Sequence, residues 1–474
     1  MNELGKNINL KVLKIILQVI SIVSFVAMIV IPYDVEFKST TILPIFYLLT
    51  ISFVAKNEIS GIGTLAVILV YAFRMCILPI ICAIGNFYLE PSKSIYIEYY
   101  FEAIILMCVE NAIVFVSLVY YNKKRLCHSY RGTYKVRANG NLLNAISVIT
   151  IFAFVLLIVA NPDFMGMFHL ASFDIASADS IQETYGTLQN LGYKYYLFAL
   201  FVIFARPIIS FFLTYKLLKF DNMFATLLAI CISVMNIFIY TDRRIYSLLI
   251  GGICMIQIIF HFRKRMTKKV FILVLVLLVV LTLFYSFMGE DTPYRIARKF
   301  QRYFSGPTLT AIGIAVNQRF FQGPIVFLKL LFNNSFILSG LFGSFEVPNR
   351  VIELCGSAGK SIWTPMTIGS IQYFSILFPV VLILVTKFVV KLDEVASEFG
   401  RNDMKIMLLN YMSLSLAVYM IMYSVELVIY NLCFFCLVYL PLIKCDSKIY
   451  IGFGKRRKVC GEKGFSTYVP YKKM

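Results

Sequence analysis

The first candidates for chemistry are Arg295, Arg298 and Arg302, whose spacing places them on one face of a helix. A guanidinium donates several hydrogen bonds in a fixed plane and keeps its charge at any physiological pH. Three of them in one stripe suit a ligand that carries several anionic oxygens. Tyr303 lies on the apolar face of the same helix and belongs to the same candidate site.

Arg243 and Arg244 form a second candidate site, in the short turn Thr241–Arg244 between two apolar segments. Two guanidiniums at the mouth of a pair of helices make a clamp for a phosphate group. The alternative is simple contact with lipid headgroups.

Arg74 and Arg206 fall inside apolar segments, where a central arginine costs about 2.5–3.5 kcal/mol. Glu110 lies at a similar depth to Arg74 in the next, antiparallel segment, which predicts an ion pair that leaves Arg74 with donors to line a cavity. Arg206 precedes Pro207, which frees a backbone carbonyl that the guanidinium could bind. For both arginines a structural role and an anion-binding role remain open.

The elements that must position these residues are membrane helices. The chain has 474 residues, 59% of them hydrophobic, with a mean hydropathy of +0.79, and its apolar runs are long enough to cross a bilayer. We predict an all-α polytopic membrane protein, a single membrane domain over residues 1–474, with about twelve spans. The predicted spans are 11–31, 40–55, 62–84, 99–120, 142–160, 195–215, 223–240, 245–260, 270–288, 367–390, 406–423 and 425–443.

The basic residues predict the orientation of these spans. With the N-terminus inside, the inner segments hold 29 of the 45 Lys and Arg residues and the outer segments hold 13, of which eight lie in 289–366. Both termini are then cytoplasmic, and residues 444–474 form a basic cytoplasmic tail. The net charge of +20 is explained by topology and contact with anionic lipid rather than by binding to nucleic acid.

The large outer loop, residues 289–366, interrupts the membrane pattern for the longest stretch. Its arginine helix also carries an apolar stripe, so we expect it to lie flat on a membrane surface. Thr308–Val316 and Pro324–Phe332 are predicted to be interfacial or re-entrant helices, and Asn333–Met366 a loop.

Several enzyme classes are excluded by what the sequence does not contain. No glycine-rich stretch ends in Gly-Lys-Ser/Thr, so the chain has no ATPase of its own. No Gly-x-Ser-x-Gly elbow is present, which argues against a nucleophilic hydrolase. Of the three histidines only His169 is predicted to face outward, so a histidine metal cluster is not available there. We expect no cofactor.

Two short motifs carry a resemblance to a known family. Arg243-Arg244-Ile-Tyr-Ser-Leu-Leu249 opens a mid-chain span, and Arg302-Tyr-Phe-Ser-Gly-Pro307 lies in the large loop. In these motifs, in its dozen spans and in its one dominant outer loop, the chain resembles the Wzy-type polymerases of O-antigen and capsule repeat units.

The resemblance implies a glycosyltransferase with a GT-C-like architecture. The donor would be a growing glycan on undecaprenyl pyrophosphate, the acceptor a single lipid-linked repeat unit, and the place the outer face of the bacterial cytoplasmic membrane. The arginines would stabilise the charge that develops on the departing pyrophosphate, with no metal required. A base must take the proton of the acceptor hydroxyl. The candidates are Asp242, Glu102 and His169, with Glu290 and Asp291 as further alternatives among which the sequence does not choose. A chain-length regulator is an expected partner.

Three other functions share parts of this pattern. A ligase that moves finished glycan from the same lipid would depend on an outer histidine, for which His169 is available. A lipid-linked oligosaccharide flippase also has about twelve spans and a cationic cavity, but two similar halves are not evident in the sequence. An ion-coupled transporter would have interrupted helices at matching positions, which are not found. The polymerase is therefore favoured over the ligase, and the ligase over the other two.

Overall fold

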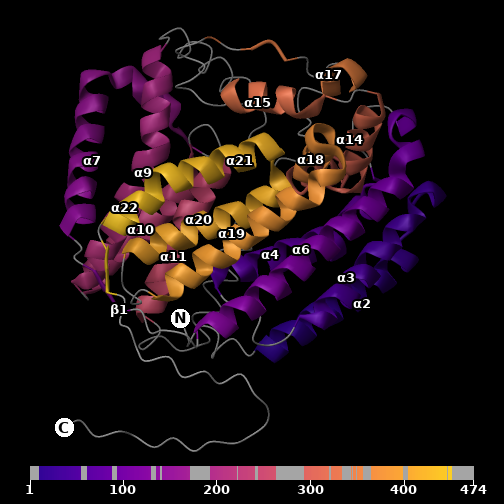
Figure 1. Cartoon of the computed structure of the whole chain (residues 1–474), viewed down its shortest axis with the longest axis horizontal. Coiled ribbons are helices and arrows are strands. Elements are labelled where there is room, and N and C mark those ends of the chain that lie inside the picture. Colours follow the sequence, from indigo (N-terminus) through magenta and orange to yellow (C-terminus); the bar gives the residue numbers. More distant parts are fainter. Residues whose placement is uncertain are drawn as a thin grey trace, which may run out of the picture.

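The computed structural model describes residues 10–54, 61–87, 93–129, 135–138, 141–170, 193–220, 222–240, 244–262, 293–319, 322–333, 343, 345–347, 350–355, 365–398, 404–445 and 447–450. Within these ranges the chain is almost entirely helical (Figure 1). Eight of its helical stretches are long and apolar enough to cross a membrane. The chain is therefore a multi-pass membrane protein.

Each predicted span except 270–288, which lies outside the described residues, coincides with a helix. The helices at these spans are α2 (Leu10–Val30), α3 (Ile42–Phe53), α4 (Ile62–Ala72) continued by α5 (Leu78–Ile84), α6 (Tyr100–Ser129), α7 (Asn141–Ala160), α9 (Tyr193–Lys219), α10 (Met223–Phe238), α11 (Arg244–Phe262), α18 (Met366–Phe374) continued by α19 (Phe378–Glu398), α20 (Met404–Met422), and α21 (Val425–Phe434) continued by α22 (Leu440–Cys445). Of these, α3, α10 and α11 are too short to count among the eight stretches.

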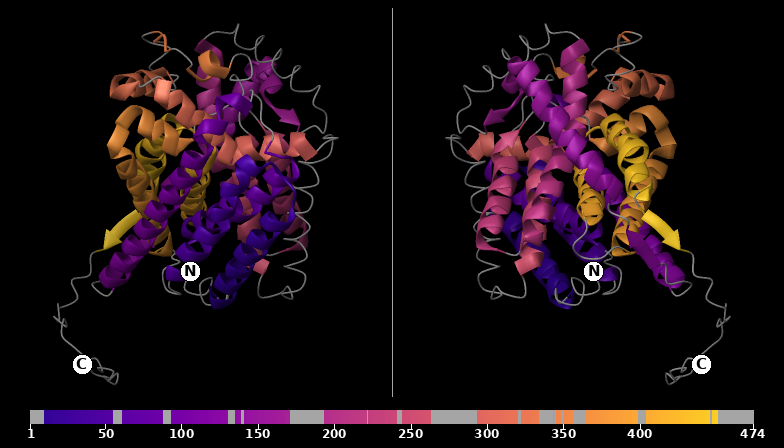
Figure 2. Two further views of the ribbon diagram at one scale, coloured as in Figure 1. Left: turned by 90° about the vertical axis from the view of Figure 1, so that its right-hand side faces the viewer. Right: turned by 90° about the vertical axis from the view of Figure 1, so that its left-hand side faces the viewer.

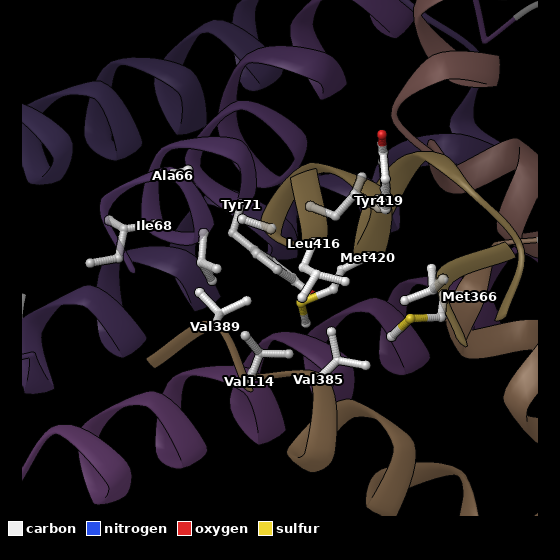
Figure 3. Packing of buried hydrophobic residues seen from close by; sticks show 14 of the residues in the cluster. Ala66, Ile68, Tyr71, Val114, Met366, Val385, Val389, Leu416, Tyr419 and Met420 are labelled. Atoms are coloured by element: carbon white, nitrogen blue, oxygen red, sulfur yellow. The ribbon is translucent and has the colours of Figure 1, made fainter. Parts of the chain in front are cut away.

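The core lies where α4, α6, α19 and α20 pack against one another, so the first third of the chain is joined to the last (Figure 3). Tyr71 of α4, Val114 of α6, Val389 of α19 and Leu416 of α20 are all fully or almost fully buried there. Contacts between such distant segments join the helices of the bundle into one body. These contacts also determine which predicted spans are neighbours, and hydropathy alone does not predict that.

Apolar side chains also cover much of the outside of the bundle. Ile29 of α2, Val116 of α6, Phe152 of α7 and Phe224 of α10 each expose more than 60% of their surface. A water-soluble protein seldom exposes apolar surface over so many helices, whereas a lipid-facing surface requires it.

Two spans contain a short π-helical turn, at Phe73–Ile77 between α4 and α5, and at Phe435–Tyr439 between α21 and α22. In both cases a proline, Pro79 or Pro441, follows the turn by two residues. Proline has no N–H and its ring collides with the carbonyl four residues earlier, so the helix widens there. Arg74 lies in the first of these turns.

The start of α4 is capped by a buried carboxylate from a distant helix. Asp393 of α19 is fully buried and accepts hydrogen bonds from Gly63 N at 3.1 Å, Thr64 N at 2.8 Å and Ser413 Oγ at 2.8 Å. Free N–H groups at a helix N-terminus are well matched by an anion. A Cβ on Gly63 would meet Ser413 Oγ at 1.7 Å, so this close approach requires glycine.

Two pairs of short strands connect segments that the charge pattern places on the same side. Strand β1 (Lys135–Ala138) pairs antiparallel with β4 (Ser447–Tyr450), and β2 (His169–Leu170) pairs with β3 (Ile239–Tyr240). The β1–β4 pair lies at the lower end of the bundle, and the loop helices α15 and α17 lie at the upper end (Figures 1 and 2).

The described part of the large loop consists of α13 (Pro293–Tyr303), α14 (Pro307–Arg319), α15 (Gly323–Asn333) and α17 (Arg350–Cys355). The two predicted loop helices are present but differ in environment. Helix α14 is buried almost throughout and packs against α6 and α18, so closely that a Cβ on Gly313 would meet Ile368 Cγ2 at 2.7 Å. Helix α15 covers α18 and α21 and exposes Ile325 and Leu328.

Candidate functional site

Arg74 joins two transmembrane helices to the large loop. Its Nη1 forms a buried ion pair with Glu110 Oε1, and Tyr71 Oη donates to the same oxygen at 2.7 Å. Its Nε donates to the carbonyl of Ser305, between α13 and α14, at 3.1 Å. The ion pair predicted from the equal depth of the two residues is present. The contact to Ser305 is not visible in the sequence, because 231 residues separate the two.

The turn at Ser305 ends α13 and is strained. Ser305 adopts a left-handed backbone with φ of 46°, and Gly306 N donates to Gln301 O at 2.9 Å, as in the common helix C-terminal motif that glycine favours. A non-glycine residue there costs about 1–2 kcal/mol. The Ser305 hydroxyl donates to the carbonyl of Ile421 at the end of α20, so the strained residue anchors both of its polar groups in the bundle.

Helix α13 lies against protein rather than flat on a membrane surface. Its Phe300 and Phe304 pack on Phe73, with ring centroids 5.7 Å and 4.4 Å away. The expected lipid-facing stripe is thus used to dock the helix beside the π-helical turn of Arg74. Strong amphipathicity specifies only that one face is covered, and here α5 and its neighbours cover it.

The arginine stripe of α13 is therefore held at the same end of the bundle as Arg74. Arg298 and Arg302 are partly buried, and Tyr303 is half-exposed. The side chain of Arg295 lies outside the described residues. Docking of α13 gives these guanidiniums fixed positions, which a freely moving surface helix would not provide.

Arg206 binds only uncharged groups in the part of the chain that the structure describes. Its Nε donates to Asn236 Oδ1 at 3.0 Å, and its Nη2 donates to the carbonyls of Asn236, at 3.3 Å, and Ile239. Asn236 also exchanges hydrogen bonds with Ser210. Arg206 therefore caps the C-terminal carbonyls of α10, a favourable place for a cation.

The β2–β3 pair brings the backbone of one more predicted residue, His169, close to the carbonyl that Arg206 binds. The backbone of His169 pairs with Tyr240, next to the carbonyl of Ile239 that accepts from Arg206. Residues 241–243, including Asp242 and Arg243, lie outside the described residues, as do the side chains of His169 and Arg244. The backbone of Arg244 opens α11.

The last turn of α20 contacts residues next to both α13 and α11. On one side its Ile421 carbonyl accepts from Ser305, beside α13. On the other side the ring of Tyr419 contacts that of Tyr246, two residues after Arg244, with centroids 5.4 Å apart. Tyr246 Oη also donates to Asn431 Oδ1 of α21 at 3.1 Å. The C-terminal end of α13 and the first turns of α11 thus both lie beside the last turn of α20.

Glu102 stands apart from this arrangement. It lies on the exposed side of the first turn of α6, while Tyr100 two residues earlier is buried and bonds Thr40 Oγ1 at 2.8 Å. Among the described residues, no group of three or more His, Cys, Asp or Glu side chains gathers in a way that could hold a metal ion.

Sequence reasoning did not select Tyr246, Tyr419 or Glu426 as site residues. The first two are aromatic residues in apolar helices, a pattern typical of ordinary core packing. Glu426 was visible as an acidic residue in the turn before the last span, but nothing in the sequence connects that turn to α13. The missing signal is the packing of α20 against both α11 and α13.

No match was found for this chain among models of protein families, among curated proteins or among solved structures.

Proposed function

We propose that this protein is a glycosyltransferase that polymerises undecaprenyl-pyrophosphate-linked oligosaccharide repeat units into a surface polysaccharide. It would act at the outer face of the bacterial cytoplasmic membrane, with twelve spans, a GT-C-like architecture and both termini in the cytoplasm. The motifs at Arg243–Leu249 and Arg302–Pro307 suggest this chemistry through their resemblance to Wzy-type polymerases.

The attachment of α13 to the bundle supports the proposal beyond what the sequence indicates. The arginine helix α13 is fastened to the bundle through Arg74 and Ser305, at the end where α11 begins with Arg244. Guanidiniums that are held in place before the reaction stabilise developing negative charge without the cost of reorganising solvent. A lipid pyrophosphate that reaches this end of the bundle from the membrane would meet them with its charged group.

The transfer requires a bond to be made and a bond to be broken at one carbon atom. The acceptor hydroxyl attacks the anomeric carbon of the donor sugar while the bond from that carbon to the phosphate oxygen breaks. Arg298 and Arg302 would stabilise the leaving pyrophosphate, together with Arg243 and Arg244. One preorganised donor in an anion hole typically contributes about 2.7–4 kcal/mol.

A ligase that uses the same lipid-linked donor is the second candidate. The β2–β3 pair places the backbone of His169 next to the turn that contains Arg243. A histidine beside an anion site fits a ligase that depends on an outer histidine. His169→Ala should therefore abolish transfer in a ligase and have a small effect in a polymerase that uses another base.

The deciding experiment deletes the gene in its host and sizes both lipid-linked and surface glycan. We expect single repeat units to accumulate on the outer side, with no ladder of longer chains. Wild type should restore the ladder, whereas Arg298→Ala and Arg302→Ala should not. Arg319→Ala is the matched control, because Arg319 is an exposed arginine in the same loop.

Other outcomes would reject the polymerase. Single units confined to the cytoplasmic side would identify a flippase. Full-length polymer that remains attached to undecaprenyl pyrophosphate would identify a ligase. Unchanged glycan in the deletion strain would show that the protein acts on neither substrate.

A further inference from the structure

Three buried polar atoms without hydrogen-bond partners lie at the meeting point of α18, α20 and α21. They are Thr367 Oγ1 in the first turn of α18, Tyr419 Oη in the last turn of α20 and Glu426 Oε2 in the first turn of α21. Each is closed off from solvent and has no partner among the described residues. Folded proteins satisfy nearly all buried polar groups, so three such atoms together point to a polar ligand.

These atoms belong to the end turns of three helices that meet one another. Helices α18, α20 and α21 all pack against each other, and a Cβ on Gly369 would meet Val425 Cγ1 at 3.0 Å. The first turn of α18 therefore lies directly on the first turn of α21. The hydroxyl of Tyr419 points away from the apolar core cluster (Figure 3).

This group of atoms is placed between the two candidate anion sites. Ser305, which ends the arginine helix, donates to Ile421, and Tyr246, near the start of α11, contacts Tyr419. Both contacts involve the same last turn of α20. A sugar hydroxyl bound at Tyr419 and Glu426 would lie at the end of the bundle where both sets of arginines are gathered.

The other buried carboxylates that the structure describes already accept hydrogen bonds from protein groups. Glu110 receives Arg74 and Tyr71, and Asp393 accepts three hydrogen bonds at the start of α4. Glu102 is exposed. Glu426 is largely buried, and its Oε2 has no hydrogen-bond partner among the described residues, which is the environment expected for a group that accepts a proton from a substrate.

We propose that Glu426 is the general base of the transfer and that Tyr419 and Thr367 bind the acceptor sugar. This inference rests on the proposed function. The acceptor hydroxyl gives its proton to Glu426 Oε2, and its oxygen forms the new bond to the anomeric carbon. The carbon–oxygen bond to the donor phosphate breaks, and its electron pair leaves with undecaprenyl pyrophosphate. Glu426 then releases the proton to solvent before the next cycle.

The test measures polymerisation rates of purified protein in liposomes supplied with lipid-linked repeat units. Glu426→Gln keeps the shape of the side chain and removes the base, so we expect kcat to fall by at least about 100-fold, the usual contribution of a general base, with the KM for the acceptor nearly unchanged. Glu426→Asp keeps a carboxylate and should lose less. Glu98→Gln is the control, since Glu98 is exposed on the short 3-10 helix that packs beside α14.

The result also separates this inference from the proposed function. If wild-type protein forms no polymer, the proposed function itself fails. If wild type is active and Glu426→Gln keeps more than about a tenth of its kcat, only the assignment of Glu426 is overturned. Added formate should restore part of the activity of Glu426→Ala if the carboxylate is a base. A loss of activity that formate does not restore would indicate a structural role and would also overturn the assignment.

Discussion

The two arginines inside the bundle, Arg74 and Arg206, both carry a positive charge that the surrounding protein must balance, and different groups balance it. Arg74 meets a carboxylate, Glu110, so the pair carries no net charge. Arg206 meets an amide and two backbone carbonyls, so in the described structure its charge is balanced only by dipoles. Their partners also differ in position, because Arg74 reaches the large loop whereas Arg206 caps a neighbouring helix.

Because their partners differ, we infer different roles for Arg74 and Arg206. A neutralised arginine attracts an anion weakly, so Arg74 serves chiefly to hold the Ser305 turn and with it α13. An arginine balanced by dipoles leaves a positive potential at its end of the bundle, where a buried charge is little screened. We therefore expect Arg206 to favour the binding of an anion through its field, although its Nε and Nη2 already donate to neighbouring groups.

The largest effect is expected from Arg74→Ala. Removal of the guanidinium leaves Glu110 buried without its counter-charge, which typically costs about 3–5 kcal/mol. Thermal unfolding in detergent should show a large fall in melting temperature. Arg74→Met combined with Glu110→Met removes both charges and should recover most of that stability. A single substitution as mild as the double one would show that the ion pair is not what stabilises this region.

A smaller loss of stability is expected from Arg206→Gln. The amide can still bind Asn236 or one carbonyl, so the cost should be about 1–2 kcal/mol. The positive charge is lost completely, however, and the rate of glycan transfer should fall about tenfold, which corresponds to about 1.4 kcal/mol. Arg206→Lys keeps the charge and should keep most of the rate. Equal rates in Arg206→Gln and wild type would contradict the role assigned to the field of Arg206.

The Ser305 turn allows the loop connection to be tested by itself. Ser305→Ala keeps the left-handed strain and loses the hydroxyl bond to Ile421, so we expect a loss of about 1 kcal/mol. Ser305→Gly loses the same bond but relieves about 1 kcal/mol of backbone strain, so its stability should stay close to that of wild type. Identical melting temperatures for the two variants would show that the backbone at this position is not strained in solution.

The smallest effect is expected at an ion pair outside this region. Lys391 Nζ and Glu394 Oε2 are 2.7 Å apart, but the lysine side chain is 65% exposed. Lys391→Ala should cost less than about 0.5 kcal/mol, because exposed pairs are screened by solvent. The comparison with Arg74→Ala tests whether burial, rather than charge pairing alone, sets the size of the effect.

Local sequence signals predicted the helices well. Apolar runs located the spans, and Ser305-Gly306-Pro307 correctly marked the end of α13. The ion pair between Arg74 and Glu110 followed from their depth in adjacent antiparallel spans. Each of these predictions depends on residues that are close in sequence or in consecutive elements, where the geometry of one helix or one hairpin is sufficient.

The environment of each loop helix was not predictable in this way. The arginine helix was expected on a lipid surface and is docked on Phe73, and α14, expected to be interfacial or re-entrant, is buried within the bundle. An amphipathic sequence states that a face must be covered, but lipid and protein cover it equally well. Whether lipid or protein covers these helices depends on the positions of α5, α6 and α18, and no local sequence pattern specifies those positions.

What the sequence by itself determined is therefore the set of membrane helices, the distribution of positive charge and the presence of arginine stripes. Tertiary structure alone decided that α20 packs against both α11 and α13, that Arg74 donates to the carbonyl of Ser305 and that the first turn of α18 lies on the first turn of α21. The physical reason is that hydropathy and helix periodicity act over a few turns, whereas these contacts join residues from 50 to more than 200 positions apart. Only the packing of the whole bundle brings such residues together.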